Sequence, residues 1–150
     1  MKIIATLLLL ISVNLPPRQP NCRCKKASDA ESIHWGNDPV QYSGDVAVKS
    51  VRGKVMLPDG EALGDALVAV FDKPAEEIYV YRLDSGKRLA ACKTGKDGSF
   101  CFAGLRPKKY VVCASSSRVE LKAVCRSVKL VPAGRRGSKR GLSFMLELSI

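Results

Sequence analysis

The distribution of apolar and polar positions predicts a protein built of short strands. From residue 46 to the end of the chain, apolar residues recur at every second position in short runs separated by turns. Val51, Gly53 and Val55 share one face of such a run, and residues 142–150 give the clearest alternation. A period of two is typical of a strand with one buried face. No stretch has the 3.6-residue period of a long amphipathic helix, so the pattern predicts an all-β fold.

Several segments add detail to this pattern. Residues 66–71 are apolar throughout, which predicts a strand buried on both faces. Residues 78–83 are predicted as the next strand, with Tyr79 and Tyr81 on the same face. The alternation changes phase near residues 123–124, which predicts a bulge or a turn there.

Short motifs follow one another in a distinctive order along this region. They are Val51-Arg52-Gly53-Lys54-Val55, Pro58-Asp59-Gly60, Thr94-Gly95-Lys96-Asp97-Gly98-Ser99-Phe100-Cys101-Phe102, Leu105-Arg106-Pro107 and Tyr110-Val111-Val112. This succession resembles the carboxypeptidase regulatory-like domain. The resemblance implies a seven-stranded, prealbumin-like (immunoglobulin-like) antiparallel β-sandwich, which we place at residues 46–150.

The first 45 residues differ from the rest of the chain. Met1-Lys2 is followed by an apolar run from Ile3 to Leu15, which has the form of a secretory signal. Residues 1–20 are therefore expected to be a signal peptide or an N-terminal anchor. Residues 21–45 contain Pro, Gly and charged residues without an apolar period, which predicts a linker.

The six cysteines favour an oxidising compartment, and with the leader they predict a secreted or periplasmic protein. Cys22 and Cys24 lie in the expected linker, and four lie in the expected domain: Cys92, Cys101, Cys113 and Cys125. These four allow three pairings. We favour Cys113 with Cys125, because the segment between them is short enough for a hairpin. A zinc site is disfavoured because none of the four forms a Cys-x-x-Cys pair.

Positive charge is concentrated in the C-terminal part of the chain. The formal net charge is +11, and residues 106–150 hold eleven cations against two acids. Seven of these cations form two clusters: Arg106, Lys108 and Lys109, and then Arg135, Arg136, Lys139 and Arg140. Such clusters predict contact with an anionic partner, either a protein or an anionic envelope surface. The alternative is a cationic surface that only keeps the protein soluble. Nucleic acid is not expected, because no aromatic residues are interleaved with the cations.

Catalysis is not expected from this composition. Zinc peptidases and serine or cysteine hydrolases need histidine ligands or a base beside the nucleophile, and the only histidine is His34. The three serines 115–117 are therefore expected to end a strand or form a turn. The sequence predicts no catalytic site, metal or cofactor.

The function predicted from sequence is that of an exported, non-catalytic module with a structural or surface-interaction role. The alternative is a carbohydrate-binding, starch-binding-like accessory module. Such a module needs exposed aromatic side chains, and the candidates are Trp35, Tyr42, Tyr79 and Tyr81.

Overall fold

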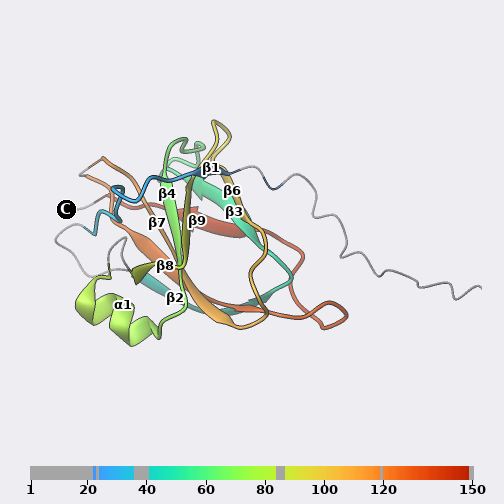
Figure 1. The fold of residues 1–150 in the computed structure, drawn as a ribbon. Coiled ribbons are helices and arrows are strands. Elements are labelled where there is room, and N and C mark those ends of the chain that lie inside the picture. The colour runs from blue at the N-terminus through green and yellow to red at the C-terminus, as the bar shows by residue number, and fades with distance from the viewer. Residues whose placement is uncertain (1–21, 23, 36–40, 84–86, 119, 149–150) are drawn as a thin grey trace, which may run out of the picture.

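The computed structural model describes residues 22, 24–35, 41–83, 87–118 and 120–148. These residues form nine strands and one short helix, arranged as two sheets packed face to face (Figure 1). The strands are β1 (Lys25–Lys26), β2 (Gln41–Val48), β3 (Val51–Met56), β4 (Leu67–Phe71), β5 (Ala90–Lys93), β6 (Ser99–Phe102), β7 (Lys109–Ser115), β8 (Val124–Leu130) and β9 (Leu142–Met145); the helix is α1 (Ala75–Tyr81). The predicted all-β sandwich is confirmed. The predicted leader at 1–20 lies outside the described residues.

The seven strands that lie wholly within residues 46–150 are arranged four against three. The larger sheet has the order β1-β5-β4-β7-β8-β2 and the smaller one the order β6-β3-β9. β1 and β2 begin within residues 21–45, so part of the expected linker instead adds a strand to each edge of the larger sheet. Two pairs, β3 with β9 and β2 with β8, run parallel, so the sandwich is not antiparallel throughout.

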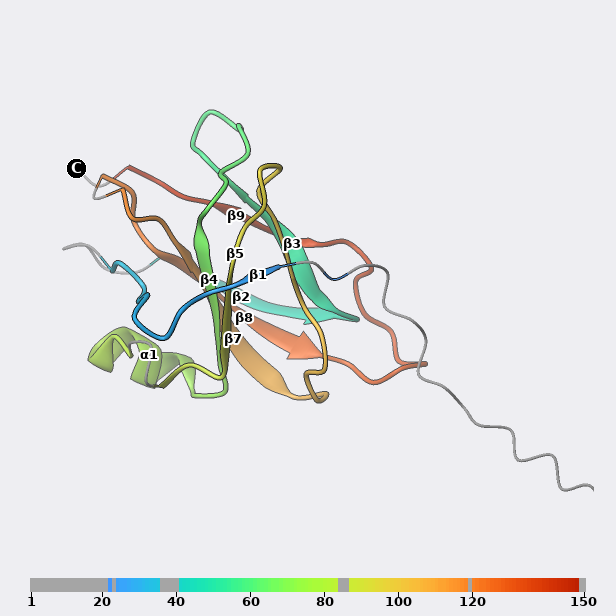
Figure 2. The ribbon, with the colours of Figure 1, turned by 45° about the horizontal axis from the view of Figure 1, so that its top comes forward.

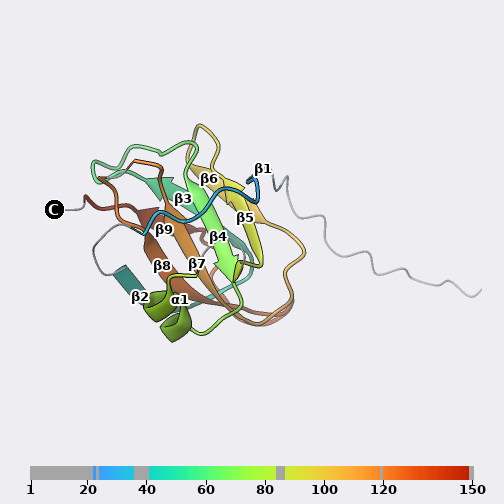
Figure 3. The ribbon, with the colours of Figure 1, turned by 60° about the vertical axis from the view of Figure 1, so that its left-hand side comes forward.

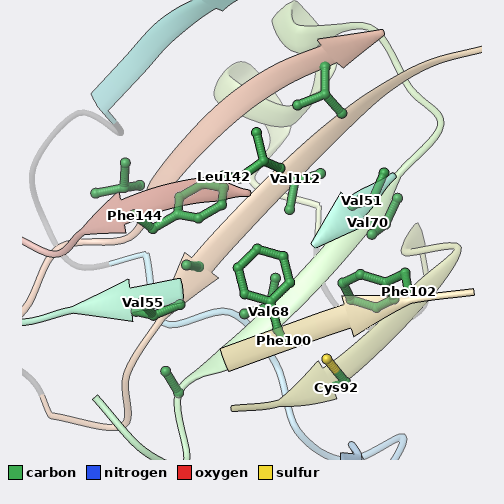
Figure 4. Close-up of a cluster of buried hydrophobic side chains, with 14 of the residues drawn as sticks. Val51, Val55, Val68, Val70, Cys92, Phe100, Phe102, Val112, Leu142 and Phe144 are labelled. Carbon is green, nitrogen blue, oxygen red and sulfur yellow. The ribbon is translucent and has the colours of Figure 1, made fainter. Parts of the chain in front are cut away.

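The main core fills the space between the two sheets (Figure 4). The Phe100 ring lies 6.2 Å from that of Phe102 and 5.8 Å from that of Phe144, measured between centroids. Val55 and Val68 are fully buried beside them. The alternation seen in the sequence at β3, β6 and β9 corresponds to residues that point into this core and residues that point away.

A second apolar cluster covers the outer face of the larger sheet. Residues 22 and 24–35, which we call the N-terminal strap, cross this face together with α1 (Figure 3). Ala27 and Ile33 of the strap and Ile78 of α1 are buried there. This second cover explains why all five residues of β4 are buried, as the apolar run 66–71 predicted.

The strand predicted at 78–83 is wrong, because α1 occupies most of this segment. Pro74 caps the helix, Glu76 and Glu77 lie in its first turn, and it ends where Arg82 adopts a left-handed conformation with φ 45°. Acidic residues in the first turn favour a helix electrostatically. Ile78 of this short helix is fully buried, and Ala75 and Tyr79 pack beside it against the second apolar cluster. Tyr79 and Tyr81 therefore do not share a strand face.

Two disulfides join the strap to the sheets, and a third joins two neighbouring strands of the larger sheet. Cys113 and Cys125 lie directly opposite each other on β7 and β8 and form the predicted disulfide. The other two domain cysteines do not pair with each other but with the strap, as Cys22–Cys101 and Cys24–Cys92. Strap residues pair along the edge of β5, which brings the cysteines together.

Candidate anion-binding end of the sandwich

Three connections converge at one end of the sandwich (Figure 2): the β2–β3 turn at 49–50, the β6–β7 loop at 103–108 and the β8–β9 loop at 131–141. Together with the adjoining ends of β7 and β8 they carry nine exposed cations and no acid. We call this surface the cationic end; its cations are Lys49, Arg106, Lys108, Lys109, Lys129, Arg135, Arg136, Lys139 and Arg140. All seven contact residues expected from the sequence lie here.

The two cationic clusters of the sequence are joined through β7 and β8. Lys109 at the start of β7 lies opposite Lys129 in β8. The backbone N–H of Leu130 donates to the carbonyl oxygen of Lys108 at 3.0 Å, which extends this pairing into the β6–β7 loop. Lys129 therefore bridges the two clusters. Sequence reasoning missed Lys129 because only the register of the two strands places it there.

The β8–β9 loop is fixed to the β2–β3 turn by backbone hydrogen bonds. The N–H of Lys49 donates to the carbonyl of Ser138 at 3.2 Å, and the N–H of Ser138 donates to the carbonyl of Ala47 at 2.9 Å. The guanidinium of Arg52 donates to the carbonyl of Lys139 at 3.4 Å. These bonds hold the backbone of the loop while its cationic side chains stay exposed.

Tyr110 fixes the other cationic loop. Its buried hydroxyl donates to the carbonyl of Arg106 at 2.6 Å, and burial raises the pKa of this hydroxyl. The Lys108 ammonium lies 3.6 Å from the Asp72 carboxylate and 5.9 Å from the centre of the Tyr110 ring. In the part of the chain that the structure describes, Lys108 is the one cation of this end within 4.0 Å of a carboxylate.

Two hollows at this end are lined by cations. One of about 710 Å³ is lined by Lys129, Arg135 and Arg136. Another, of about 360 Å³, is lined by Arg106, by Lys108 and by Asp72, the carboxylate partner of Lys108. Guanidinium and ammonium groups without a carboxylate partner are the groups that bind phosphate, sulfate or carboxylate.

The opposite end of the sandwich has the opposite balance of charge. The β3–β4 loop, the β5–β6 turn, the β7–β8 connection and the residues after β9 carry six acids against three cations among their described residues. The acids are Asp59, Glu61, Asp65, Asp97, Glu120 and Glu147. The β4–β5 connection, which also lies at the cationic end, adds three described acids (Asp72, Glu76 and Glu77) and four cations (Lys73, Arg82, Lys87 and Arg88). Positive charge therefore predominates at the cationic end and negative charge at the opposite end.

The strap brings His34 to the serine run. The backbone N–H of His34 donates to Ser115 Oγ at 3.2 Å, so the contact is made by the main chain and not by the imidazole. Ser115 is the last residue of β7, as expected of a strand end. His34 and the serines 115–117 line a hollow of about 320 Å³.

An ion pair borders the same hollow. Glu31 binds Lys93 and accepts a hydrogen bond from the N–H of Ser28 at 2.8 Å. The bond with Lys93, followed by that with Ser28, lowers the pKa of the Glu31 carboxyl, and Glu31 in turn raises the pKa of Lys93. Among the described residues, no three His, Cys, Asp or Glu side chains are grouped so that they could hold a metal ion.

Two of the four candidate aromatic residues do not form an exposed platform. Trp35 and Tyr79 are partly buried and pack against the second apolar cluster. The side chains of Tyr42 and Tyr81 lie outside the described ones.

Comparison with known proteins finds only weak similarity to solved structures. No family model and no curated protein matches the chain. Among solved structures, the chain is similar to 3-chlorocatechol 1,2-dioxygenase from Rhodococcus opacus 1CP, with a TM-score of 0.41, 14% identity and 78% of this chain covered. It is also similar to catechol 1,2-dioxygenase from Pseudomonas arvilla C-1, with a TM-score of 0.39, 14% identity and 78% coverage. The aligned regions span 64% and 60% of those two chains.

Proposed function

We propose that this protein is an exported, non-catalytic binding module whose cationic end binds an anionic partner. The observation that carries the proposal is the presence of nine exposed cations and no acid on three adjoining connections and the adjoining ends of β7 and β8. If the cations served solubility alone, they would not need to be concentrated at one end of the sandwich. The acids gathered at the opposite end therefore favour binding over solubility.

Export is supported by the disulfides. All six cysteines are paired, and disulfides persist in oxidising compartments. The apolar run at Ile3–Leu15 supports a leader that directs the chain to such a compartment. In the described part of the chain, no helix has the length and apolar character needed to cross a membrane.

A module role is supported by the architecture. The seven strands β3–β9, packed four against three, support the proposed resemblance to the carboxypeptidase regulatory-like domain. The loops at the cationic end are hydrogen-bonded to the sandwich, so they present their side chains from a rigid base. A surface that is already ordered loses little conformational entropy on binding.

The proposal is tested by elution from an immobilised sulfated polysaccharide. The first variant replaces Arg135, Arg136, Lys139 and Arg140 with Gln. The control variant removes the same charge from exposed lysines away from this end, by replacing Lys25, Lys26, Lys54 and Lys96 with Gln. We expect the first variant to elute at clearly lower salt than the control, because closely spaced cations reinforce one another. Equal elution of the two variants would refute the proposal, since only net charge would then matter.

A further inference from the structure

Apolar residues lie between the cations at the cationic end. Leu105 and Pro107 of the β6–β7 loop line a hollow of about 210 Å³ together with Val131, Pro132 and Ala133 of the β8–β9 loop. Pro107, Pro132 and Ala133 are exposed, and the other two are half-buried. The apolar residues of the two loops therefore face a common space between the two cationic clusters.

Leu89 extends this apolar surface. It lies just before β5, is 51% exposed, and lines a second hollow together with Arg106 and the ion pair of Lys108 with Asp72. An exposed leucine beside two cations adds apolar area without adding charge. The cationic end is therefore amphipathic: its cations surround a group of apolar loop residues.

The N-terminal part of the chain joins the fold next to this end. Cys22 is bonded to Cys101, and Cys101 lies opposite Arg52 in the β3–β6 pair. Arg52 in turn contacts the backbone of the β8–β9 loop at Lys139. Cys22, the first described residue, is thus linked through Cys101 and Arg52 to the cationic loop.

We propose that the anionic partner is the surface of a lipid bilayer with acidic headgroups, and that the cationic end lies on it with the apolar loop residues at headgroup level. This inference rests on the proposed function. Cations near an acidic membrane gain electrostatic attraction, and apolar side chains gain from burial at the boundary with the acyl chains. A soluble anionic polymer would use the cations alone. The apolar residues between the clusters therefore favour a bilayer over a polymer.

The test uses the full oxidised chain and three variants in co-sedimentation with lipid vesicles. The vesicles contain phosphatidylcholine alone or phosphatidylcholine with phosphatidylglycerol. The charge variant and its charge-matched control are those described above. The third variant, Leu89→Gln with Ala133→Gln, removes apolar surface without changing charge. A parallel measurement uses a soluble sulfated polysaccharide, and comparison among variants of one chain cancels any contribution of the leader.

We expect the charge variant to bind acidic vesicles at least about tenfold more weakly than the control variant. We expect the apolar variant to bind them about fivefold more weakly than the unchanged protein, with unchanged binding to the polysaccharide. If the charge variant loses polysaccharide binding while vesicle binding is the same for all variants, the bilayer is not the partner and the proposed function stands. If neither ligand distinguishes the charge variant from its control, the proposed function itself fails. The inference would also be overturned if the apolar variant bound acidic vesicles and the polysaccharide more weakly than the unchanged protein by the same factor. The apolar residues would then make no contribution specific to a bilayer.

Discussion

The two disulfides of the strap should stabilise the protein by less than the sum of their separate effects. Cys22–Cys101 and Cys24–Cys92 close loops of 79 and 68 residues, and one loop lies inside the other. When either disulfide is present, the other closes only a loop of about 11 residues, the difference between the two separations. The first disulfide to form therefore lowers the conformational entropy of the unfolded chain by more than the second one does.

The chain-entropy relation gives the sizes of the effects. A loop of 68 residues corresponds to about 4.4 kcal/mol of stabilisation, and a loop of about 11 residues to about 2.8 kcal/mol. Removing either disulfide alone should thus cost about 2.8 kcal/mol, whereas removing both should cost about 7 kcal/mol. The double change should exceed the sum of the single changes by about 1.6 kcal/mol.

The assay is urea unfolding of the oxidised protein at equilibrium. Three variants are compared: Cys22→Ala with Cys101→Ala, Cys24→Ala with Cys92→Ala, and all four changes together. Any packing cost of alanine at the buried Cys92 is common to two of the variants and cancels in the excess. Trp35, the only tryptophan, lies on the strap and packs against the second cluster, so its fluorescence reports whether the strap remains docked.

Two results would refute this reasoning. One is an excess of zero or below with the strap docked, since nested loops require a positive value. The other is a cost of about 4.4 kcal/mol for each single removal, which would mean that each disulfide acts as if the other were absent. The disulfide Cys113–Cys125, which closes a separate loop of 12 residues, provides the reference for an independent bridge of similar size.

Further predictions concern packing and pH. Gly53→Ala should cost more than 3 kcal/mol in urea unfolding, because the added Cβ would overlap the backbone of β9; Gly60→Ala, at φ 87° with open space around it, should cost only about 1–2 kcal/mol. Ile78→Ala should cost about 2–4 kcal/mol, since this fully buried side chain attaches α1 to the sheet, and the same unfolding assay measures it. The lowered pKa of Glu31 means that its ion pair with Lys93 stabilises the fold above the unfolded pKa, near 4.5, and that this contribution is lost as pH falls through the folded value. Glu31→Gln should therefore lose stability at pH 7 but differ less from the unchanged protein at pH 3, and equal differences at both pH values would contradict this.

The strands with one apolar face could be predicted from the sequence because a period of two has a direct physical cause. Phe100 and Phe102 must both reach the core, so Cys101 between them must point away. The segment 78–83 misled the same reasoning, since its aromatic and β-branched residues suit a strand as well as a helix. The tertiary position of Ile78, over a sheet face that needs covering, adds to the local effect of Glu76 and Glu77 in the first turn and favours the helix.

The strap could not be predicted from its local composition. Residues 24–35 have no sustained apolar period, because only Ala27 and Ile33 are fully covered and the rest of the segment follows an irregular path. A signal was nevertheless present in the strands below it. β4 and β7 are apolar on both faces, so some segment outside the two sheets had to cover the outer face.

The segregation of charge follows from the order of the strands and not from any single motif. Each strand from β2 to β9 reverses the direction of the one before it, so successive connections fall at alternate ends of the sandwich. The connection 57–66, with three acids and no cation, thus lies at one end, and the cationic connections, 103–108 and 131–141, lie at the other. The two cationic clusters can form one surface only because an even number of strands, β7 and β8, lies between them in the sequence. Inserting or deleting one strand would move the second cluster to the acidic end, so the proposed binding surface depends on the topology as much as on the cations themselves.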